Sequence, residues 1–508
     1  MGFQRKINRC DMLDCALCED APCAKACNKI ACDEALRSIW FDNEDGAALN
    51  LPEKLPCEEC DAPCEKACII NSATQKENDE NIRMRKGQVP VRELMMALHQ
   101  IKQEEEIPDR DNATKLQTHI CGIPLENPFL LSSSVVASSY DMCARAFEMG
   151  WAGAAFKTIS FLDIHEASPR FSAIKGDNGS IIGFKNIEQL SDHAVAENMD
   201  IFRKLKEDYP NKFLLVSIMG RNEEEWTTLA RMATEAGADA LELNFSCPNM
   251  AEDGLGSDIG QIPELVERYT AATRKGSRIP ILAKLTPNTG MMSEAALAAK
   301  RGGADGLAAI NTIKSIVGIN PHTYVSSPSV HGQSAVGGYS GQAVRPIALR
   351  FIAELGKNPE LKGMHLSGMG GVETWKDALE FMLLGAGSIQ ITTAVMQYGY
   401  RIIDDLLDGL LGYLNEKGFH SVEEIIGLGL DAVCDTEDLE RDTIIYPKFQ
   451  RNKCIGCGRC FLSCRDGGHQ AIAMGKDRKP ILNAHKCVGC HLCTLVCPVN
   501  AIASNKRR

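Results

Sequence analysis

The sequence has no apolar stretch long enough to cross a membrane. A transmembrane helix needs about 20 consecutive, mainly apolar residues, and the most apolar stretch here, 381–396, is interrupted by Gly and Gln. The start of the chain leads into no apolar run of the kind that a secretory signal contains, and position 6 is Lys where the myristoylation pattern has Ser or Thr. We therefore expect a cytoplasmic protein that does not associate with membranes.

Basic residues and dinucleotide motifs are also scarce. The 508 residues include 55 Lys and Arg against 67 Asp and Glu, a formal net charge of −12. A surface of this sign repels phosphate backbones, which disfavours general nucleic-acid binding. A G-x-G-x-x-G dinucleotide fingerprint after a strand is absent, because Gly337-Gly-Tyr-Ser-Gly341 has the wrong spacing.

Eight apolar runs are present in the middle of the chain. They are 129–136, 153–159, 213–220, 240–247, 280–287, 306–313, 365–372 and 388–395. The runs lack polar alternation and are followed by amphipathic, helix-like stretches, as expected of parallel strands buried on both faces. Eight such units over about 300 residues predict an α/β fold, a (β/α)8 TIM barrel, with an open doubly wound sheet as the alternative.

The 22 Cys cluster at the two ends of the chain, ten between Cys10 and Cys68 and eight between Cys454 and Cys497. In a reducing cytosol, dense cysteines indicate metal ligands and not disulfides. We therefore divide the chain into four parts. These are an N-terminal iron–sulfur region (1–72), a solvated, charged helical linker (73–116) with a helix near 91–101, a catalytic barrel (117–432) and a two-cluster ferredoxin domain (433–508).

The C-terminal cysteines repeat the C-x2-C-x2-C-x3-C spacing of bacterial two-cluster ferredoxins, in which the fourth Cys ligates the other cluster. One [4Fe-4S] cluster is therefore assigned to Cys454, Cys457, Cys460 and Cys497, and the other to Cys487, Cys490, Cys493 and Cys464. Arg465 departs from the pattern where the second repeat has Pro498, but neither residue is a ligand. A pair of zinc sites is the alternative, which the interleaved set of eight disfavours.

The N-terminal cysteines form a less regular near-repeat, with Asp-Ala-Pro-Cys in both copies. Its members are Cys15, Cys18, Cys23 and Cys27, then Cys57, Cys60, Cys64 and Cys68. Eight Cys suffice for two further [4Fe-4S] clusters, with zinc as a stronger alternative here. The spacing leaves open which Cys belongs to which cluster, and Cys10 and Cys32 are interpreted as spare thiols.

The carboxyl ends of barrel strands carry catalytic residues, and here they include two lysines. Burying Lys157 and Lys284 is costly unless an anion compensates them. Glycines after the seventh run (Gly370, Gly371) and threonines after the eighth (Thr392, Thr393) suit a phosphate bound by backbone N–H groups. A phosphate together with a ring that gains negative charge indicates flavin mononucleotide (FMN). The alternative is that each lysine is a salt-bridged structural residue.

Cys247 is the candidate proton donor, because a thiol near its free pKa of about 8.5 is mostly protonated at neutral pH. The loop that continues through 250–257 is small and polar enough for a mobile lid. Polar groups for a flat polar ring come from Asn186, Glu188, Asn244, Asn311 and Thr312. Each Asn at a strand end is equally well explained as a loop cap.

These motifs together resemble the dihydropyrimidine dehydrogenase family, in particular the catalytic subunit of the bacterial NAD-dependent enzyme, over roughly residues 115–505. The motifs are Phe156-Lys-Thr158, Gly183-Phe-Lys-Asn186-Ile-Glu188, Asn244-Phe-Ser-Cys247-Pro, Ala283-Lys284-Leu-Thr-Pro-Asn288, Ile310-Asn-Thr312, Ser340-Gly341 and the C-terminal ferredoxin repeat. The N-terminal block resembles the cluster-binding region that precedes the FAD and NAD(P)H domains in the family, for which this chain has no room.

The resemblance implies roles for individual residues. FMN would be held by Ser133, Lys157, Thr158, Lys284, Gly341, Gly370, Gly371, Thr392 and Thr393, and the pyrimidine by Asn186, Asn244, Ser246, Asn311 and Thr312. Cys247 would protonate C5 while the flavin N5 transfers hydride to C6 of uracil or thymine. Electrons would come through the clusters from an FAD-containing, NAD(P)H-oxidising flavoprotein subunit or a ferredoxin, in a homodimer or heterotetramer.

Three other functions are compatible with parts of the sequence. A dihydroorotate dehydrogenase shares the barrel and the Ser-Cys-Pro-Asn249 loop, where animal dihydropyrimidine dehydrogenases have His in place of Asn, but no additional cation for orotate's carboxylate is evident. A tRNA-uridine reductase is disfavoured by the −12 charge and the ferredoxin block. An electron-transfer subunit with a non-catalytic barrel is disfavoured by the presence of Cys247 and both lysines.

Overall fold

The computed structural model describes residues 7, 15–74, 88–176, 180–250 and 255–504. Its internal contacts separate two units, Met1–Asp431 and Ala432–Arg508. None of the described helices combines the length and the apolar composition that crossing a membrane requires. Part of the expected lid, residues 251–254, lies outside the described residues.

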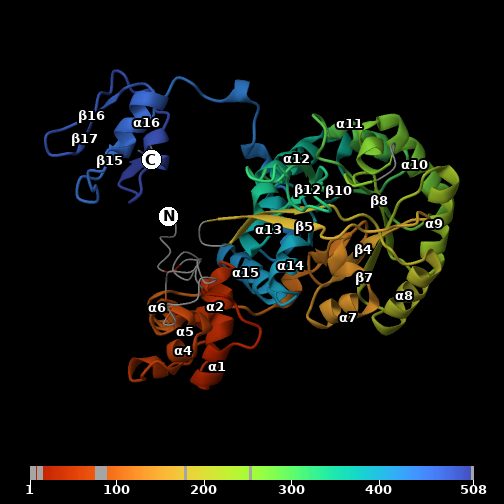
Figure 1. Ribbon diagram of the computed structural model, residues 1–508, viewed down its shortest axis with the longest axis horizontal. Helices are drawn as coiled ribbons and strands as arrows, with labels where there is room; N and C mark the ends of the chain where they lie inside the picture. The colour runs from red at the N-terminus through yellow and green to blue at the C-terminus, as the bar shows by residue number, and fades with distance from the viewer. Residues whose placement is uncertain (1–6, 8–14, 75–87, 177–179, 251–254, 505–508) are drawn as a thin grey trace. The chain divides into compact units, whose positions relative to one another are not determined.

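Eight parallel strands close into a barrel in the first unit, which confirms the predicted fold (Figure 1). In barrel order they are β3 (Phe129–Leu131), β4 (Gly153–Ile159), β7 (Phe213–Ile218), β8 (Ala240–Asn244), β9 (Ile281–Lys284), β10 (Gly306–Ala309), β13 (His365–Gly368) and β14 (Ser388–Ile391). The parallel pairing of β14 with β3 closes the ring and excludes the open sheet. Most predicted runs continue past the end of their strand, because their last residues belong to the loops at the carboxyl end.

Helices surround the strands, which explains why every residue of β4 and β7 is buried. The helices are α7 (Tyr140–Glu148), α8 (Val195–Asp208), α9 (Glu223–Glu235), α10 (Pro263–Gly276), α11 (Ser293–Arg301), α12 (Arg345–Lys357), α13 (Trp375–Leu383), α14 (Thr393–Tyr398) and α15 (Ile402–Lys417). Polar side chains fix several helix starts: Ser139 caps α7, Asn222 caps α9, and Thr374 forms a capping box with Asp377 in α13.

Two smaller sheets lie at opposite ends of the barrel. A hairpin of β1 (Thr118–Ile120) and β2 (Ile123–Leu125) packs its apolar side chains against the first residues of several barrel strands. At the carboxyl end, the segments that follow β4 and β10 form an antiparallel sheet. Its order is β11 (Ile313–Ser315), β12 (Gly337–Ser340), β6 (Ile181–Asn186) and β5 (Phe171–Lys175). This sheet brings Asn186 and Gly341 to the end of the barrel where function is expected.

The N-terminal cysteine region is built from short helices and packs on the barrel. The helices are α1 (Pro22–Cys27), α2 (Cys32–Trp40), α3 (Glu44–Leu49), α4 (Pro63–Ala67), α5 (Ile69–Thr74) and α6 (Val91–Glu104). Arg37 of α2 forms an ion pair of 2.8 Å with the buried Asp405 of α15, and Trp40 packs edge-on against Tyr398 of α14. The linker was expected to be solvated, but α6 buries Leu94, among other residues, in the same core, because its apolar face contacts α2, α3 and α4.

The second unit consists of two antiparallel strand pairs and two helices. Strand β15 (Pro447–Phe449) pairs with β18 (Ile502–Ser504), and β16 (Ile472–Met474) pairs with β17 (Pro480–Leu482). Helices α16 (Arg459–Gly467) and α17 (Leu492–Leu495) each begin within a Cys triplet, so that the third Cys of the triplet lies in the first turn of the helix. The small core consists of Cys460, Ile472, Cys493 and Ile502, so cluster-ligand positions make up half of it.

Candidate functional site

A cavity of about 1110 Å³, including its open mouth, lies at the carboxyl end of the barrel. Every barrel and substrate residue predicted from the sequence lines it except Ser246: Ser133, Lys157, Thr158, Asn186, Asn244, Cys247, Lys284, Asn311, Thr312, Gly341, Gly370, Gly371, Thr392 and Thr393. Ser246 is fully buried, and its hydroxyl accepts a hydrogen bond of 2.8 Å from Asn311 Nδ2. Ser246 therefore positions Asn311 and does not face the cavity.

The two strand-end lysines are compensated by carboxylates of the protein. Lys157 Nζ lies 2.7 Å from Glu188 Oε1 and 3.7 Å from Glu166 Oε1. Lys284 Nζ lies 3.3 Å from Glu242 Oε1. The sequence argument ascribed this compensation to a bound anion, whereas both lysines are salt-bridged and also line the cavity. The two explanations are therefore not exclusive, and the cavity gains little net positive charge from either lysine.

At the end of the cavity lined by Gly341, Gly370, Gly371, Thr392 and Thr393, a ligand can come close to the backbone because the glycines have no side chains. Gly341, Gly370 and Gly371 have φ values of +87°, +123° and +85°, a region that L side chains rarely adopt. A Cβ on Gly371 would lie 2.8 Å from Gly341 O, and one on Gly370 would lie 2.9 Å from Ala348 Cβ. Backbone N–H groups exposed by such turns bind phosphate. Together with Lys284, which lines the same cavity, these residues fit flavin mononucleotide.

Asn244 positions the loop that carries Cys247. Its Oδ1 accepts hydrogen bonds from the backbone N–H of Ser246 (3.2 Å) and Cys247 (3.1 Å), and its Nδ2 donates to Thr158 Oγ1 (2.9 Å). Asn244 is therefore the loop cap that the sequence left as an alternative, and it lines the cavity as well. Asn186 is similarly engaged, because its Oδ1 accepts from Asn249 Nδ2 at 3.0 Å.

Cys247 is nearly inaccessible, at 6% exposed, and lines the cavity. Burial raises the pKa of its thiol to about 11, with Glu166 adding to the effect and Lys157 and Lys284 opposing it. A thiol with this pKa is protonated throughout the neutral range. The protonated thiol is the form that a general acid needs.

Sequence reasoning missed Glu242 and Gln390, and it named Asn249 without giving it a role in the site. Glu242 and Gln390 lie within β8 and β14, below the strand ends, and Asn249 follows the Ser-Cys-Pro motif. Asn249 Nδ2 donates to Asn186 Oδ1 and to Glu188 O, which leaves the buried Asn249 Oδ1 without a protein partner. Polar residues inside otherwise apolar strand runs were the available signal for Glu242 and Gln390.

The C-terminal cysteines surround two cavities. One, of about 370 Å³, is lined by Cys454, Cys457, Cys460 and Cys497, and the other, of about 310 Å³, by Cys464, Cys487, Cys490 and Cys493. These are the two interleaved sets assigned from the spacing. The thiols stand around each cavity, and in the described parts of the chain no three His, Cys, Asp or Glu side chains converge as a single metal ion would need. Four thiolates around such a space fit a [4Fe-4S] cluster.

The N-terminal cysteines also separate into two sets, which the spacing alone had left open. Cys15, Cys18, Cys23 and Cys68 line a cavity of about 550 Å³. The other four cysteines of the repeat are Cys27, Cys57, Cys60 and Cys64, and burial raises the pKa of Cys57 and of Cys64 to about 11. Each set combines both halves of the repeat because α1 packs against α4.

Cys32 is fully buried beside Cys23, whose pKa it lowers through a hydrogen bond. Cys10 lies outside the described residues.

Sequence comparison identifies both units. Residues 115–414 match the family described as dihydroorotate dehydrogenase, and residues 448–504 match the 4Fe-4S dicluster domain. The chain belongs to the dihydroorotate dehydrogenase family. It is an oxidoreductase of this family that carries a C-terminal 4Fe-4S ferredoxin domain.

The similar proteins carry the names of two different enzymes. The NAD-dependent dihydropyrimidine dehydrogenase subunit PreA of Escherichia coli is 54% identical, over 76% of this chain and 94% of that protein. The catalytic subunit of dihydroorotate dehydrogenase B (NAD(+)) of Pyrococcus abyssi is 38% identical, over 62% and 99%. The ligand-free DHODH of Eimeria tenella superimposes with a TM-score of 0.53 at 20% identity, over 63% of this chain and 93% of that one, and shows the shared fold.

Proposed function

We propose that the chain is the cytoplasmic catalytic subunit of a dihydropyrimidine dehydrogenase, which reduces uracil or thymine to the 5,6-dihydro base. FMN, when bound in the barrel cavity, supplies the conversion between single electrons and hydride. The [4Fe-4S] clusters bring the electrons from an NAD(P)H-oxidising, FAD-containing flavoprotein subunit, or from a ferredoxin, in a homodimer or heterotetramer. The E. coli relative at 54% identity, itself named as a subunit, supports this choice.

The choice of substrate rests on one observation: the lysines that line the cavity are already paired with carboxylates of the protein. Among the described residues that line the cavity, the cationic side chains are Lys157 and Lys284, and each is paired with a carboxylate of the protein. Glu188 is additionally paired with Arg170 at 3.0 Å. An anionic pyrimidine such as orotate would bring a carboxylate to a site without a free cation, which is costly. A neutral base needs only the amide and hydroxyl groups that the cavity offers.

The side chains of the chain have distinct tasks in this reaction. Asn186, Asn311 and Thr312 offer amide and hydroxyl groups to the ring, and Asn244 and Ser246 hold the loop that presents Cys247. Cys247 holds the proton destined for C5 of the base. Burial raises the pKa of the thiol to about 11, which keeps the proton on sulfur until the base is in place.

Dihydroorotate dehydrogenase activity is the second candidate, because the matching family and the Pyrococcus abyssi relative carry that name. Asn249 follows the Ser-Cys-Pro motif, lines the cavity and keeps a free buried acceptor oxygen. That acceptor suits a ring N–H of either orotate or uracil, so it does not outweigh the paired lysines.

The substrate proposal is tested by steady-state turnover of the anaerobically purified chain, with a reduced viologen dye as electron donor. We expect kcat/KM for uracil or thymine to exceed that for orotate by at least about 100-fold, since an unpaired buried charge costs several kcal/mol. NADH in place of the dye is expected to give no turnover without a partner. A preference for orotate would overturn the proposal.

The raised pKa of Cys247 predicts the pH dependence of this turnover. Because the proton-donating form is the neutral thiol, activity is retained below the pKa and lost as the pH rises through about 11. We therefore expect no loss of kcat assignable to the thiol between about pH 7 and pH 9.5, one unit above the free thiol value. The profile is measured with circular dichroism at each pH as the control for unfolding. A loss of kcat centred near pH 8 would contradict this account.

A further inference from the structure

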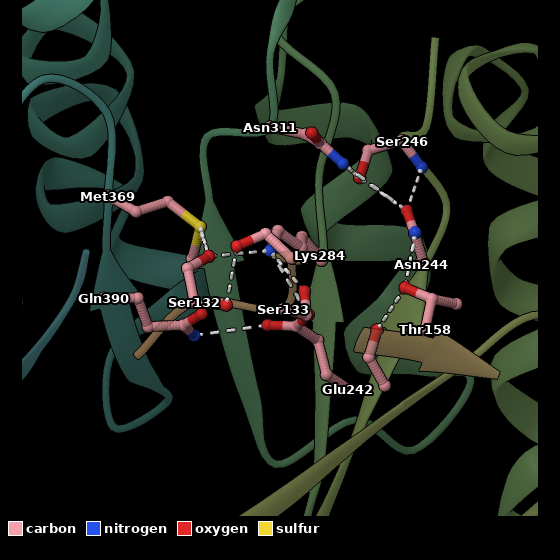
Figure 2. A network of polar contacts seen from close by, with 12 residues as sticks. Ser132, Ser133, Thr158, Glu242, Asn244, Ser246, Lys284, Asn311, Met369 and Gln390 are labelled. Carbon is pink, nitrogen blue, oxygen red and sulfur yellow. Dashed lines mark hydrogen bonds and ion pairs between the residues drawn. The ribbon is translucent and has the colours of Figure 1, made fainter. Parts of the chain in front are cut away.

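A buried side-chain network forms the floor of the barrel cavity, and Figure 2 shows its members pointing toward one another. Lys284 Nζ lies 2.9 Å from Ser133 Oγ and 3.3 Å from Glu242 Oε1, and Ser133 Oγ donates to the same carboxylate oxygen at 2.6 Å. Glu242 is fully buried, and its other oxygen, Oε2, accepts a hydrogen bond of 3.2 Å from Gln390 Nε2. The network thus joins a lysine of the cavity to an amide on the opposite side of the barrel interior.

Glu242 fixes the orientation of the Gln390 amide. A carboxylate only accepts hydrogen bonds, so the amide must turn its NH2 group toward Glu242. The same Nε2 donates at 3.1 Å to Ser367 Oγ, which occupies its second hydrogen. With both N–H groups used, the carbonyl oxygen of Gln390 points away from Glu242 and Ser367.

That carbonyl oxygen has no hydrogen-bond partner in the protein. Gln390 is 1% exposed, its Oε1 is buried and unpartnered, and the residue lines the cavity. Native proteins seldom leave a buried acceptor without a hydrogen-bond partner, because burial removes it from water, so this oxygen calls for an explanation. An N–H donor inside the cavity would satisfy it.

We propose that Gln390 Oε1 accepts a hydrogen bond from the ring N3–H of the flavin, and that Glu242 is the positioning residue that aims it. The inference rests on the proposed FMN site. N3–H is the N–H donor of the oxidised isoalloxazine ring, which gives an acceptor on the cavity floor one matching group. The pyrimidine also has N–H groups, but Gln390 lies with Ser132, Lys284 and Met369, away from Asn311 and Ser246 (Figure 2). Ser246 is the residue that precedes Cys247.

The test compares FMN with N3-methyl FMN, in which the donor hydrogen is replaced. Dissociation constants for the apoprotein of the full chain are measured by quenching of flavin fluorescence. Wild type is expected to bind FMN at least about tenfold more tightly than the methylated flavin. Gln390→Met keeps the volume and removes the acceptor, so it should bind FMN about tenfold more weakly than wild type and distinguish the two flavins by less than about threefold.

Two further variants separate this role from a structural one. Ser388→Ala lies on the same strand and contacts Ser367 and His365 but not Gln390, and it should keep the wild-type discrimination. In Glu242→Gln, residue 242 no longer dictates the orientation of the Gln390 amide. This variant should lose part of the discrimination between FMN and N3-methyl FMN, while its apoprotein remains folded. If Gln390→Met does not fold, Gln390→Leu serves the same comparison.

Each result decides the proposal. Wild-type discrimination retained in Gln390→Met would overturn it, as would a loss of uracil affinity in that variant with flavin discrimination unchanged. A wild-type chain that binds no flavin would overturn both this inference and the proposed function. A chain that binds FMN without distinguishing the methylated form would overturn the inference alone.

Discussion

Replacing Cys247 by Ala is expected to reduce uracil turnover by about 10²- to 10⁴-fold, the usual contribution of a positioned general acid. The loss follows because the thiol, buried and protonated, is the proton donor that we assign to the site. The FMN content should be unchanged, since the residues at the phosphate end and on the cavity floor stay in place. The measurement is kcat with a reduced viologen donor, beside flavin and iron determination on the same preparation.

A matched control is available on α7. Cys143 is fully buried and lies outside the cavity, so Cys143→Ala removes a buried thiol without touching the reaction. It should keep near wild-type turnover. Cys247→Ser should stay close to Cys247→Ala, because a hydroxyl is a far weaker acid than a thiol. Unchanged turnover in Cys247→Ala would remove Cys247 from the mechanism.

The loss of whole clusters on changing single cysteines is the second large effect. Cys497 lines the cavity of Cys454, Cys457 and Cys460, although it follows the other triplet in the sequence. Cys454→Ala and Cys497→Ala should therefore each lose the same cluster, roughly four iron atoms per chain. The double variant Cys454→Ala/Cys497→Ala should lose no more than either single variant.

A second double variant, which combines Cys454 with Cys464 of the same motif, distinguishes interleaved ligation from one cluster per motif. Cys464 lines the cavity of the second triplet, so Cys454→Ala/Cys464→Ala should lose both clusters, roughly eight iron atoms. Cys434→Ala, at an exposed position of the same unit, is the control and should lose none. Iron and sulfide are determined after anaerobic reconstitution of the full chain. The reverse pattern, with Cys454 and Cys464 acting together, would show that each motif binds its own cluster.

Local patterns in the sequence were sufficient to predict the barrel and to find residues that line its cavity. Runs without polar alternation predicted strands buried on both faces, and reading their carboxyl ends led to Lys157, Cys247 and Lys284. The three residues line one cavity because a parallel barrel places all strand ends at one rim. The (β/α)8 fold is confirmed by the closed ring of strands.

Contacts across the barrel and between repeats could not be predicted in the same way. Glu242 meets Lys284 and Gln390 only because three strands bring them together inside the barrel, and a single strand's sequence does not give this register. Ser246 was expected to contact substrate, yet its hydroxyl is engaged by Asn311. The grouping of the N-terminal cysteines likewise depends on packing of α1 against α4 and not on spacing.

The most direct test is a single turnover of the anaerobic, chemically reduced protein, followed by the absorbance of its flavin. On addition of excess uracil or thymine, we predict that the flavin and the clusters are reoxidised and that one dihydrouracil or dihydrothymine forms for every two electrons they lose, whereas orotate leaves the flavin reduced. Reoxidation by orotate and not by uracil, or a preparation that retains no flavin, would contradict the account.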